Sequence, residues 1–257
     1  MLNMRTILPQ PSRAAFATNI ITAPWTYDTA HTADANTILL YHAEDNAANT
    51  NVTDSSGNGY TGTSSANTNT WSGAGKFNLA LDIDGETTTS NTITLNSVAY
   101  EVLIRAALQA AITFECWIKW NANADWSAAV AADSNIVTIE DANLAGSNMF
   151  WARYERANNS IDFVFKANGT TNERKTAPAA APVDTTNWAH ICMTKSTAAD
   201  EFKAYINMVQ VGATSTGLGV FQNNDLITRI GNLRPGAVNQ AWAGFIDELA
   251  ISNKIRY

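Results

Sequence analysis

The chain has 257 residues, 46% of them hydrophobic, and a formal net charge of -7. A chain of this length and composition can bury a substantial core, and one main domain accounts for it better than two small ones. The 16 Lys and Arg residues are scattered without a basic run, which argues against nucleic-acid binding. No window approaches the ~18 consecutive apolar residues that a membrane span requires, so we expect no membrane-spanning segment.

Residues 1–35 differ in character from the rest of the chain. They are rich in Ala, Thr and Asn, and Pro9, Pro11 and Pro24 break any regular element. Because Pro9 follows directly after the apolar pair Ile7-Leu8, we expect the N-terminus to lack the apolar stretch of a signal peptide. We expect residues 1–35 to be an extended arm for attachment or oligomerisation, and residues 36–257 to form the folded body.

Short apolar or alternating segments, separated by Asn, Gly and Pro, recur through the body. Many short strands with turns between them predict an all-β sandwich or barrel. The expected strands are residues 38–42, 80–85, 92–95, 112–119, 136–139, 149–155, 161–166, 191–195, 202–206, 226–231 and 244–251.

One helix interrupts the strands. Apolar residues at spacings of three and four predict a short helix over residues 98–109, with Asn96 or Ser97 as its N-cap. In a β-sandwich this helix would be a connection. The apolar series consists of Val98, Val102, Leu103 and Ala106.

Strand alternation predicts which side chains share a face. In residues 112–119 apolar side chains alternate with polar or aromatic ones, which predicts a strand buried on one face only. Cys116 falls on that apolar face and Cys192 on an outward face, so a disulfide between them is disfavoured. Asp247 and Glu248 are adjacent, and alternation predicts that they face opposite ways and form no carboxylate pair.

An ordered set of motifs runs through the body. It consists of Leu40-Tyr41-His42 with Asp54 to Gly59, Ala80 to Gly85, Phe114 to Lys119, Trp188 to Thr194, Tyr205-Ile206-Asn207 and Gly244 to Ile251. By these motifs residues 38–257 resemble the laminin-G-like branch of the concanavalin A-like lectin/glucanase superfamily. The resemblance implies an all-β fold, a jelly-roll sandwich of two antiparallel sheets, here with the arm and one short helix added. Asn207-Met208 stands where such domains usually place Asn-Gly.

The superfamily includes sugar binders, protein binders and hydrolases, so the fold does not select a function. A hydrolase needs two carboxylates projecting from one strand, one of them a protonated acid. Asp82, Asp84 and Glu86 share a face by alternation, but Gly85 interrupts the strand and the Glu-x-Asp core of the family's glucanases is absent. The three histidines lie in unrelated sequence contexts and indicate no nucleophilic triad. We expect no enzyme activity.

Sugar recognition uses flat aromatic rings that stack on pyranoses and polar groups that bond to hydroxyls. Side chains of this kind lie on strand faces opposite the expected core, where the alternative for each is a ring covered by a loop. The glycan-binding candidates are Trp117, Trp151, Arg153, Trp188 and His190.

Calcium is the one metal that the residues suggest, because it prefers the hard oxygen ligands of Asp, Asn and backbone carbonyls, and several relatives bind it. For Asp54 and Asn58 the alternative is turn-forming hydrogen bonds. The calcium candidates are Asp54, Asn58, Asp84 and Asp247.

Two functions follow as hypotheses. The first is a non-enzymatic structural protein on the exterior of a larger assembly, most concretely a bacteriophage capsid-decoration or tail-fibre protein. The arm, the acidic Lys-poor body and the missing signal peptide favour it, and laminin-G-like domains are common in such proteins. It implies a homo-oligomer in a virion assembled in the host cytoplasm, joined to other virion subunits through residues 1–35. The alternative is a carbohydrate-binding lectin-like module that mediates adhesion to surface glycans.

Overall fold

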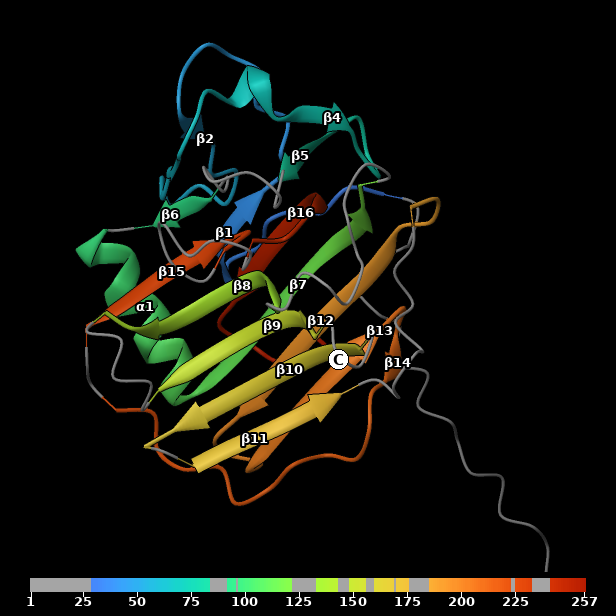
Figure 1. Cartoon of the computed structure of the whole chain (residues 1–257). Coiled ribbons are helices and arrows are strands. Elements are labelled where there is room, and N and C mark those ends of the chain that lie inside the picture. Colours follow the sequence, from blue (N-terminus) through green and yellow to red (C-terminus); the bar gives the residue numbers. More distant parts are fainter. Residues whose placement is uncertain are drawn as a thin grey trace, which may run out of the picture.

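The structure is a computed structural model, in which two antiparallel β-sheets pack face to face. Figure 1 shows the two layers stacked, with the helix α1 (Val98–Gln109) at one edge. This architecture confirms the predicted two-sheet sandwich. The structure describes residues 29–83, 92–95, 97–121, 133–142, 148–155, 160–168, 170–175 (backbone only), 185–222, 225–232 and 241–257.

The first sheet, called sheet A, has eight strands. Its long central strands are β7 and β16, and β1 pairs with the C-terminal half of β16 while β5 pairs with the N-terminal half. The strand order is β14 (Val209–Gln210), β13 (Glu201–Ile206), β12 (Ala189–Ser196), β7 (Ala111–Trp120), β16 (Gly244–Ser252), β5 (Leu79–Ile83) and β4 (Ser72–Ala74), with β1 (Thr37–Tyr41) beside β16.

The second sheet, sheet B, also has eight strands. The chain passes from sheet A to sheet B after β7, forms four consecutive strands there, and returns to sheet A after β11. The strand order is β11 (Thr170–Lys175), β10 (Ser160–Ala167), β9 (Met149–Glu155), β8 (Ser134–Asp141), β15 (Leu226–Ile230), β6 (Ile93–Leu95), β3 (Gly62–Ser64) and β2 (Asn51–Val52); a short 3-10 helix, η1 (Thr68–Thr70), lies between β3 and β4.

The core lies between the inner faces of the two sheets. Strand β9 shows the pattern clearly, since Phe150, Ala152 and Tyr154 are buried while the residues between them are partly exposed. Rings from both sheets meet there, with the centroids of Phe150 and Phe202 6.4 Å apart. Alternation therefore decides which side chains of each strand are available to a ligand on the outside.

Helix α1 has the predicted bounds and the Ser97 cap, whose hydroxyl oxygen accepts a hydrogen bond from the backbone N–H of Tyr100 at 3.5 Å. The side of the helix that packs on the body is not the one that carries the apolar series. Val98 and Val102, from the apolar series that predicts the helix, are 77% and 55% exposed. The buried residues are Tyr100, Ile104, Ala107 and Leu108.

Strand β7 is buried on both faces, so the prediction of a strand buried on one face only was wrong. Glu115 is fully buried and Trp117 is 4% exposed, although both point away from the core. The cover comes from the chain ends and one turn. The Tyr257 hydroxyl donates to Glu115, and the Lys76 ammonium lies 4.7 Å from the centroid of the Trp117 ring.

The prediction that Asp247 and Glu248 face opposite ways was also wrong. The pairing of β16 with β7 shifts register between Asp247 and Ala250, and Glu248 has a positive φ of 49°. Such a β-bulge inserts one extra residue on the same side of the strand. Ile246 and Leu249 both face the core, which leaves both carboxylates on the outer side of sheet A.

The two cysteines form no disulfide, as alternation predicted, and both are buried. The hairpin between β13 and β14 turns at Asn207 and Met208, which have φ values of 47° and 67°. Positive φ at both central residues is the signature of a type I′ turn. The turn that usually carries Asn-Gly therefore forms with Met208 in the glycine position. No helix in the described ranges has the length and apolar character needed to cross a bilayer.

Candidate functional site

The five predicted glycan-binding residues divide between the two outer faces of the sandwich. Trp151 and Arg153 project from β9 of sheet B, whereas Trp117, Trp188 and His190 belong to β7 and β12 or the residue before it in sheet A. The structure therefore does not bring the five together. Each face is a separate candidate.

On sheet B, Trp151 and Arg153 occupy alternate positions of β9, and both are partly exposed. The Arg153 guanidinium lies 5.0 Å from the centroid of the Trp151 ring. It also forms ion pairs with Asp162 at 3.0 Å and with Asp133 at 2.7 Å. The stacked contact and the ion pairs hold both planar groups in place.

The neighbouring strand continues this polar strip. Thr138 of β8 lies directly opposite Trp151, and Arg229 of β15 lies opposite Thr138. The Arg229 guanidinium donates to Glu140 at 2.9 Å. Within the described part of the chain, the indole N–H of Trp151 and the hydroxyl of Thr138 are buried without a hydrogen-bond partner.

The strip of Trp151, Arg153, Asp162, Thr138, Arg229 and Glu140 is called the sheet B strip below. Both of its arginines are neutralised by carboxylates on the next strand. Trp151 and Arg153 are partly exposed and the other four residues are buried, so the strip offers a flat ring and one guanidinium without a net positive charge. The sequence alone does not reveal that Asp162, Glu140 and Arg229 lie near Trp151. Their proximity follows from the register of β8, β9, β10 and β15.

On sheet A, Trp117 and His190 lie side by side but are buried. Their ring centroids are 5.3 Å apart, and the two residues are 4% and 3% exposed. Lys76 covers Trp117, and the Tyr257 ring lies 6.2 Å from that of His190. A ligand could reach either ring only by displacing these covers.

The same face carries a buried polar layer that sequence contexts did not indicate. The backbone N–H of His31 donates to Glu248 at 2.6 Å, and Nδ1 of His42 lies 2.8 Å from the other carboxylate oxygen. The bond to Glu248 raises the pKa of His42. Burial, with the positive charge of Arg256 nearby, lowers the pKa of His31 to about 3. The layer attaches residues 29–42 to β16.

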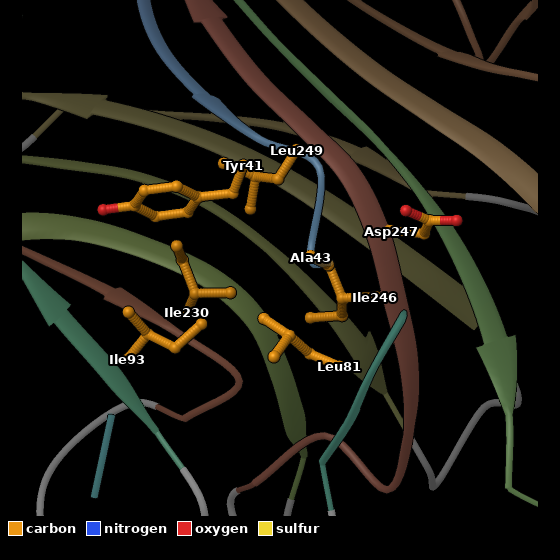
Figure 2. Close-up of a pocket in the computed structure, with 8 residues that line it drawn as sticks. All are labelled: Tyr41, Ala43, Leu81, Ile93, Ile230, Ile246, Asp247 and Leu249. Carbon is orange, nitrogen blue, oxygen red and sulfur yellow. The ribbon is translucent and has the colours of Figure 1, made fainter. Parts of the chain in front are cut away.

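Asp247 belongs to this layer. Figure 2 shows its carboxyl group across β16 from the apolar side chains of Tyr41, Ile230 and Leu249. The gaps between the residues in that view add up to about 180 Å³, but none of them is wide enough for a water molecule. They therefore offer no ligand site. Burial raises the pKa of Asp247 to about 7, and the charge of Glu248 contributes in the same direction.

The family model described as the concanavalin A-like lectin/glucanases superfamily matches residues 85–256, which is more than half of the chain. The chain belongs to this superfamily. No curated protein matches it significantly. The sandwich of sheets A and B is therefore a lectin-like domain of the concanavalin A type.

Solved structures support the fold assignment. A structure of botulinum neurotoxin type C, which depends upon interaction with two ganglioside molecules to enter cells, has 15% identity and a TM-score of 0.57, with 85% of this chain and 48% of that one covered. Domain 4 of the arabinanase AbnA from Geobacillus stearothermophilus, in complex with arabinotriose, has 17% identity and a TM-score of 0.53, with coverages of 84% and 92%. The sialidase module CBM40 of Ruminococcus gnavus, bound to sialyllactose, has 13% identity and a TM-score of 0.50, with coverages of 68% and 90%.

The chain spans about half the length of the toxin chains that it matches. At these identities the likeness concerns the fold. The structure resembles carbohydrate-binding modules and toxin binding domains, as well as domains of glycosidases.

Two calcium candidates of this concanavalin A-like domain, Asp54 and Asn58, are engaged in hydrogen bonds within the chain. The Asp54 carboxylate accepts from the backbone N–H groups of Leu40 at 3.1 Å and Tyr60 at 2.8 Å. The Asn58 amide donates to the carbonyl of Ile38 at 2.9 Å. Among the described residues no group of three or more His, Cys, Asp or Glu side chains is arranged to hold a metal ion.

The other carboxylate candidates either accept hydrogen bonds or lie outside the described residues. Asp247, another calcium candidate, accepts from the backbone N–H of Phe77 at 2.9 Å. Asp82 accepts from the side-chain amide of Asn121 at 2.9 Å. Asp84 and Glu86 lie outside the described residues.

Proposed function

We propose that this concanavalin A-like sandwich is a non-catalytic glycan-binding module and that the sheet B strip is its sugar site. The observation that carries the proposal is the partly exposed ring of Trp151, which lies 5.0 Å from the Arg153 guanidinium. A sugar ring can stack on such a surface while its hydroxyls bond to fixed donors and acceptors.

The charges of the strip favour a neutral saccharide. Arg153 and Arg229 each pair with a carboxylate, so a ligand that contacts the partly exposed Trp151 and Arg153 meets no uncompensated charge. Hydroxyl groups can accept from the Arg153 guanidinium and donate to the carboxylate of Asp133, its partly exposed partner. The arabinotriose bound to a structurally similar arabinanase domain supports a ligand of this class.

The same pairing supports a binding role over hydrolysis. A glycosidase of the usual type places one protonated acid and one ionised carboxylate on either side of the scissile bond. Glu140 and Asp162 are each engaged by an arginine. We infer that these two buried carboxylates hold the arginines in place and do not act as acid and base.

The experiment is a glycan array with the wild-type protein, followed by calorimetric titration of the best neutral ligand against variants. Trp151→Ala should weaken binding at least about tenfold, which corresponds to about 1.4 kcal/mol. Met149→Ala is the matched control, because Met149 occupies an outward, partly exposed position of the same strand. Equal affinities of the two variants, or an array without any bound glycan, would contradict the proposal.

We propose a second candidate function, membership of a larger assembly such as a bacteriophage particle formed in the host cytoplasm. The observation in its favour is the attachment of residues 29–36 to the sandwich. Asp34 forms ion pairs with Lys254 at 2.7 Å and with Arg256 at 3.0 Å, and the backbone N–H of Asn253 donates to the Asn36 carbonyl at 2.9 Å. An arm with a fixed root is suited to joining a neighbouring subunit.

Residues 1–28 of the predicted arm lie outside the described residues, so the assembly function rests on solution behaviour. Sedimentation of the full chain and of residues 29–257 tests it. A defined oligomer formed by the full chain alone supports an assembly arm. The same oligomeric state for the two proteins would refute that role and leave glycan binding as the function.

A further inference from the structure

The outer face of sheet A carries a second cluster of rings, beside the covered pair of Trp117 and His190. Phe245 of β16 lies directly opposite Lys119 of β7, and Trp188 precedes β12 at the position beside Lys119. All three side chains are partly exposed. The rings of Trp188 and Phe245 have centroids 6.1 Å apart and planes at 59°.

Lysine ammonium groups lie over these rings. The Lys119 ammonium is 5.0 Å from the Trp188 centroid and 4.8 Å from that of Phe245. In the adjoining turn, Lys76 lies 4.7 Å from the centroid of the Trp117 ring and 5.7 Å from that of Phe77. The lysine-aromatic patch is defined as Lys76, Phe77, Lys119, Trp188 and Phe245.

The chain positions Phe245 by a close approach of backbone. A Cβ atom on Gly73 of β4 would come within 2.7 Å of the Phe245 ring. The ring therefore lies against the strand at a position that has no side chain. Trp188 borders the patch on the other side of Lys119. The Lys119 ammonium therefore lies over both rings, and Lys119 as a whole is partly exposed.

The charge of this patch differs from that of the sheet B strip. No carboxylate in the described part of the chain forms an ion pair with Lys76 or Lys119, whereas both arginines of the strip are neutralised. The nearest acidic position in the row is Asp82, opposite Phe245, and its carboxylate accepts from Asn121. In a protein of net charge -7, two lysines without acidic partners mark a local cationic site.

We propose that the lysine-aromatic patch is a second glycan-binding site, selective for saccharides that carry a carboxylate. The sugar carboxylate pairs with the Lys119 ammonium, and the apolar face of the sugar packs on Trp188 or Phe245. This inference rests on the proposed function only in assigning sugar binding to the sandwich. The residues, the sheet and the ligand class are different.

The test uses matched neutral and acidic probes on the 15N-labelled full chain. Lactose is compared with sialyllactose, and glucose with glucuronate, by the NMR shift of the Trp188 indole, assigned with Trp188→Phe. Two acidic sugars of different structure separate recognition of the carboxylate from recognition of one sugar. The acidic probes should shift the Trp188 signal and the neutral ones should not, and added salt should weaken the acidic ligands.

The variant Lys119→Met keeps the aliphatic chain and removes the charge, and should weaken acidic ligands at least about tenfold. Lys119→Arg keeps the charge and should remain within about threefold of wild type. Lys203→Met is the matched control, because Lys203 lies on the same sheet and is already paired with Glu201 at 2.6 Å.

Equal shifts of Trp188 by neutral and acidic sugars would overturn the inference, and so would an unchanged acidic affinity in Lys119→Met. An acidic probe that shifts no tryptophan signal also overturns it. Trp151→Ala keeps the two proposals apart. If Lys119→Met loses acidic binding while Trp151→Ala leaves neutral binding unchanged, the sheet B site alone is refuted. If Trp151→Ala loses neutral binding while Lys119→Met leaves acidic binding unchanged, this inference alone is refuted.

Discussion

Asp247 should make the protein less stable as the pH rises, and Asp247→Asn should remove that dependence. The carboxyl group is completely buried on the outer side of β16. One oxygen accepts from the Phe77 backbone N–H at 2.9 Å, while the other has no hydrogen-bond partner in the described part of the chain. An asparagine keeps an oxygen for Phe77 and cannot ionise.

The sign follows from the raised pKa. Burial lifts the pKa of Asp247 from 3.8 to about 7 in the folded protein, so the folded state holds its proton more tightly than the unfolded state. Stability is then unaffected by this group below pH 3.8, falls as pH rises through the interval, and stays low above about 7. The full difference is on the order of 4 kcal/mol at about 1.36 kcal/mol per pKa unit.

The assay is urea unfolding of the wild type and Asp247→Asn between pH 4 and about 8. The difference in unfolding free energy between variant and wild type should grow in favour of the variant by up to about 4 kcal/mol over this range. Using the difference cancels the titration of other groups. Parallel pH profiles of the two proteins would refute the assignment of a raised pKa to Asp247.

Two further predictions concern stability and titration. Met208→Gly should stabilise the protein by about 1 kcal/mol, because Met208 has a positive φ in the β13–β14 turn, where a side chain is strained; an unchanged urea midpoint would contradict this. Glu248→Gln should lower the pKa of His42 toward its usual 6.5, because Glu248 raises it, and an NMR titration of the His42 ring measures the change. The stability that this pair supplies is present at low pH and is lost as pH rises through the raised pKa, so the variant should lose stability mainly under acidic conditions.

The elements that were predictable from the sequence are those encoded by local patterns. The strand at residues 149–155 alternates in the structure as it does in the sequence, which placed Trp151 and Arg153 together on an outward face. The helix at residues 98–109 was predictable because Ser97 caps an apolar series. Strand alternation also predicted that Cys116 and Cys192 lie on different faces and form no disulfide.

The elements that were not predictable depend on contacts between distant segments. The burial of Glu115 requires Tyr257 from the end of the chain. The shared side of Asp247 and Glu248 depends on a bulge that alternation does not reveal. The exposed Val98 shows the same limit, because periodicity identifies an apolar face but not the surface against which the helix packs.

The two proposed sugar sites lie on outer faces that look in opposite directions. Packed sheets are about 10 Å apart, and the side chains of the core fill the space between them. A short oligosaccharide held on one face therefore cannot reach the other, and one glycan chain gains no chelate advantage from having two sites. The sandwich would instead act as a bridge between two separate glycan chains, with a neutral chain on sheet B and an acidic one on sheet A.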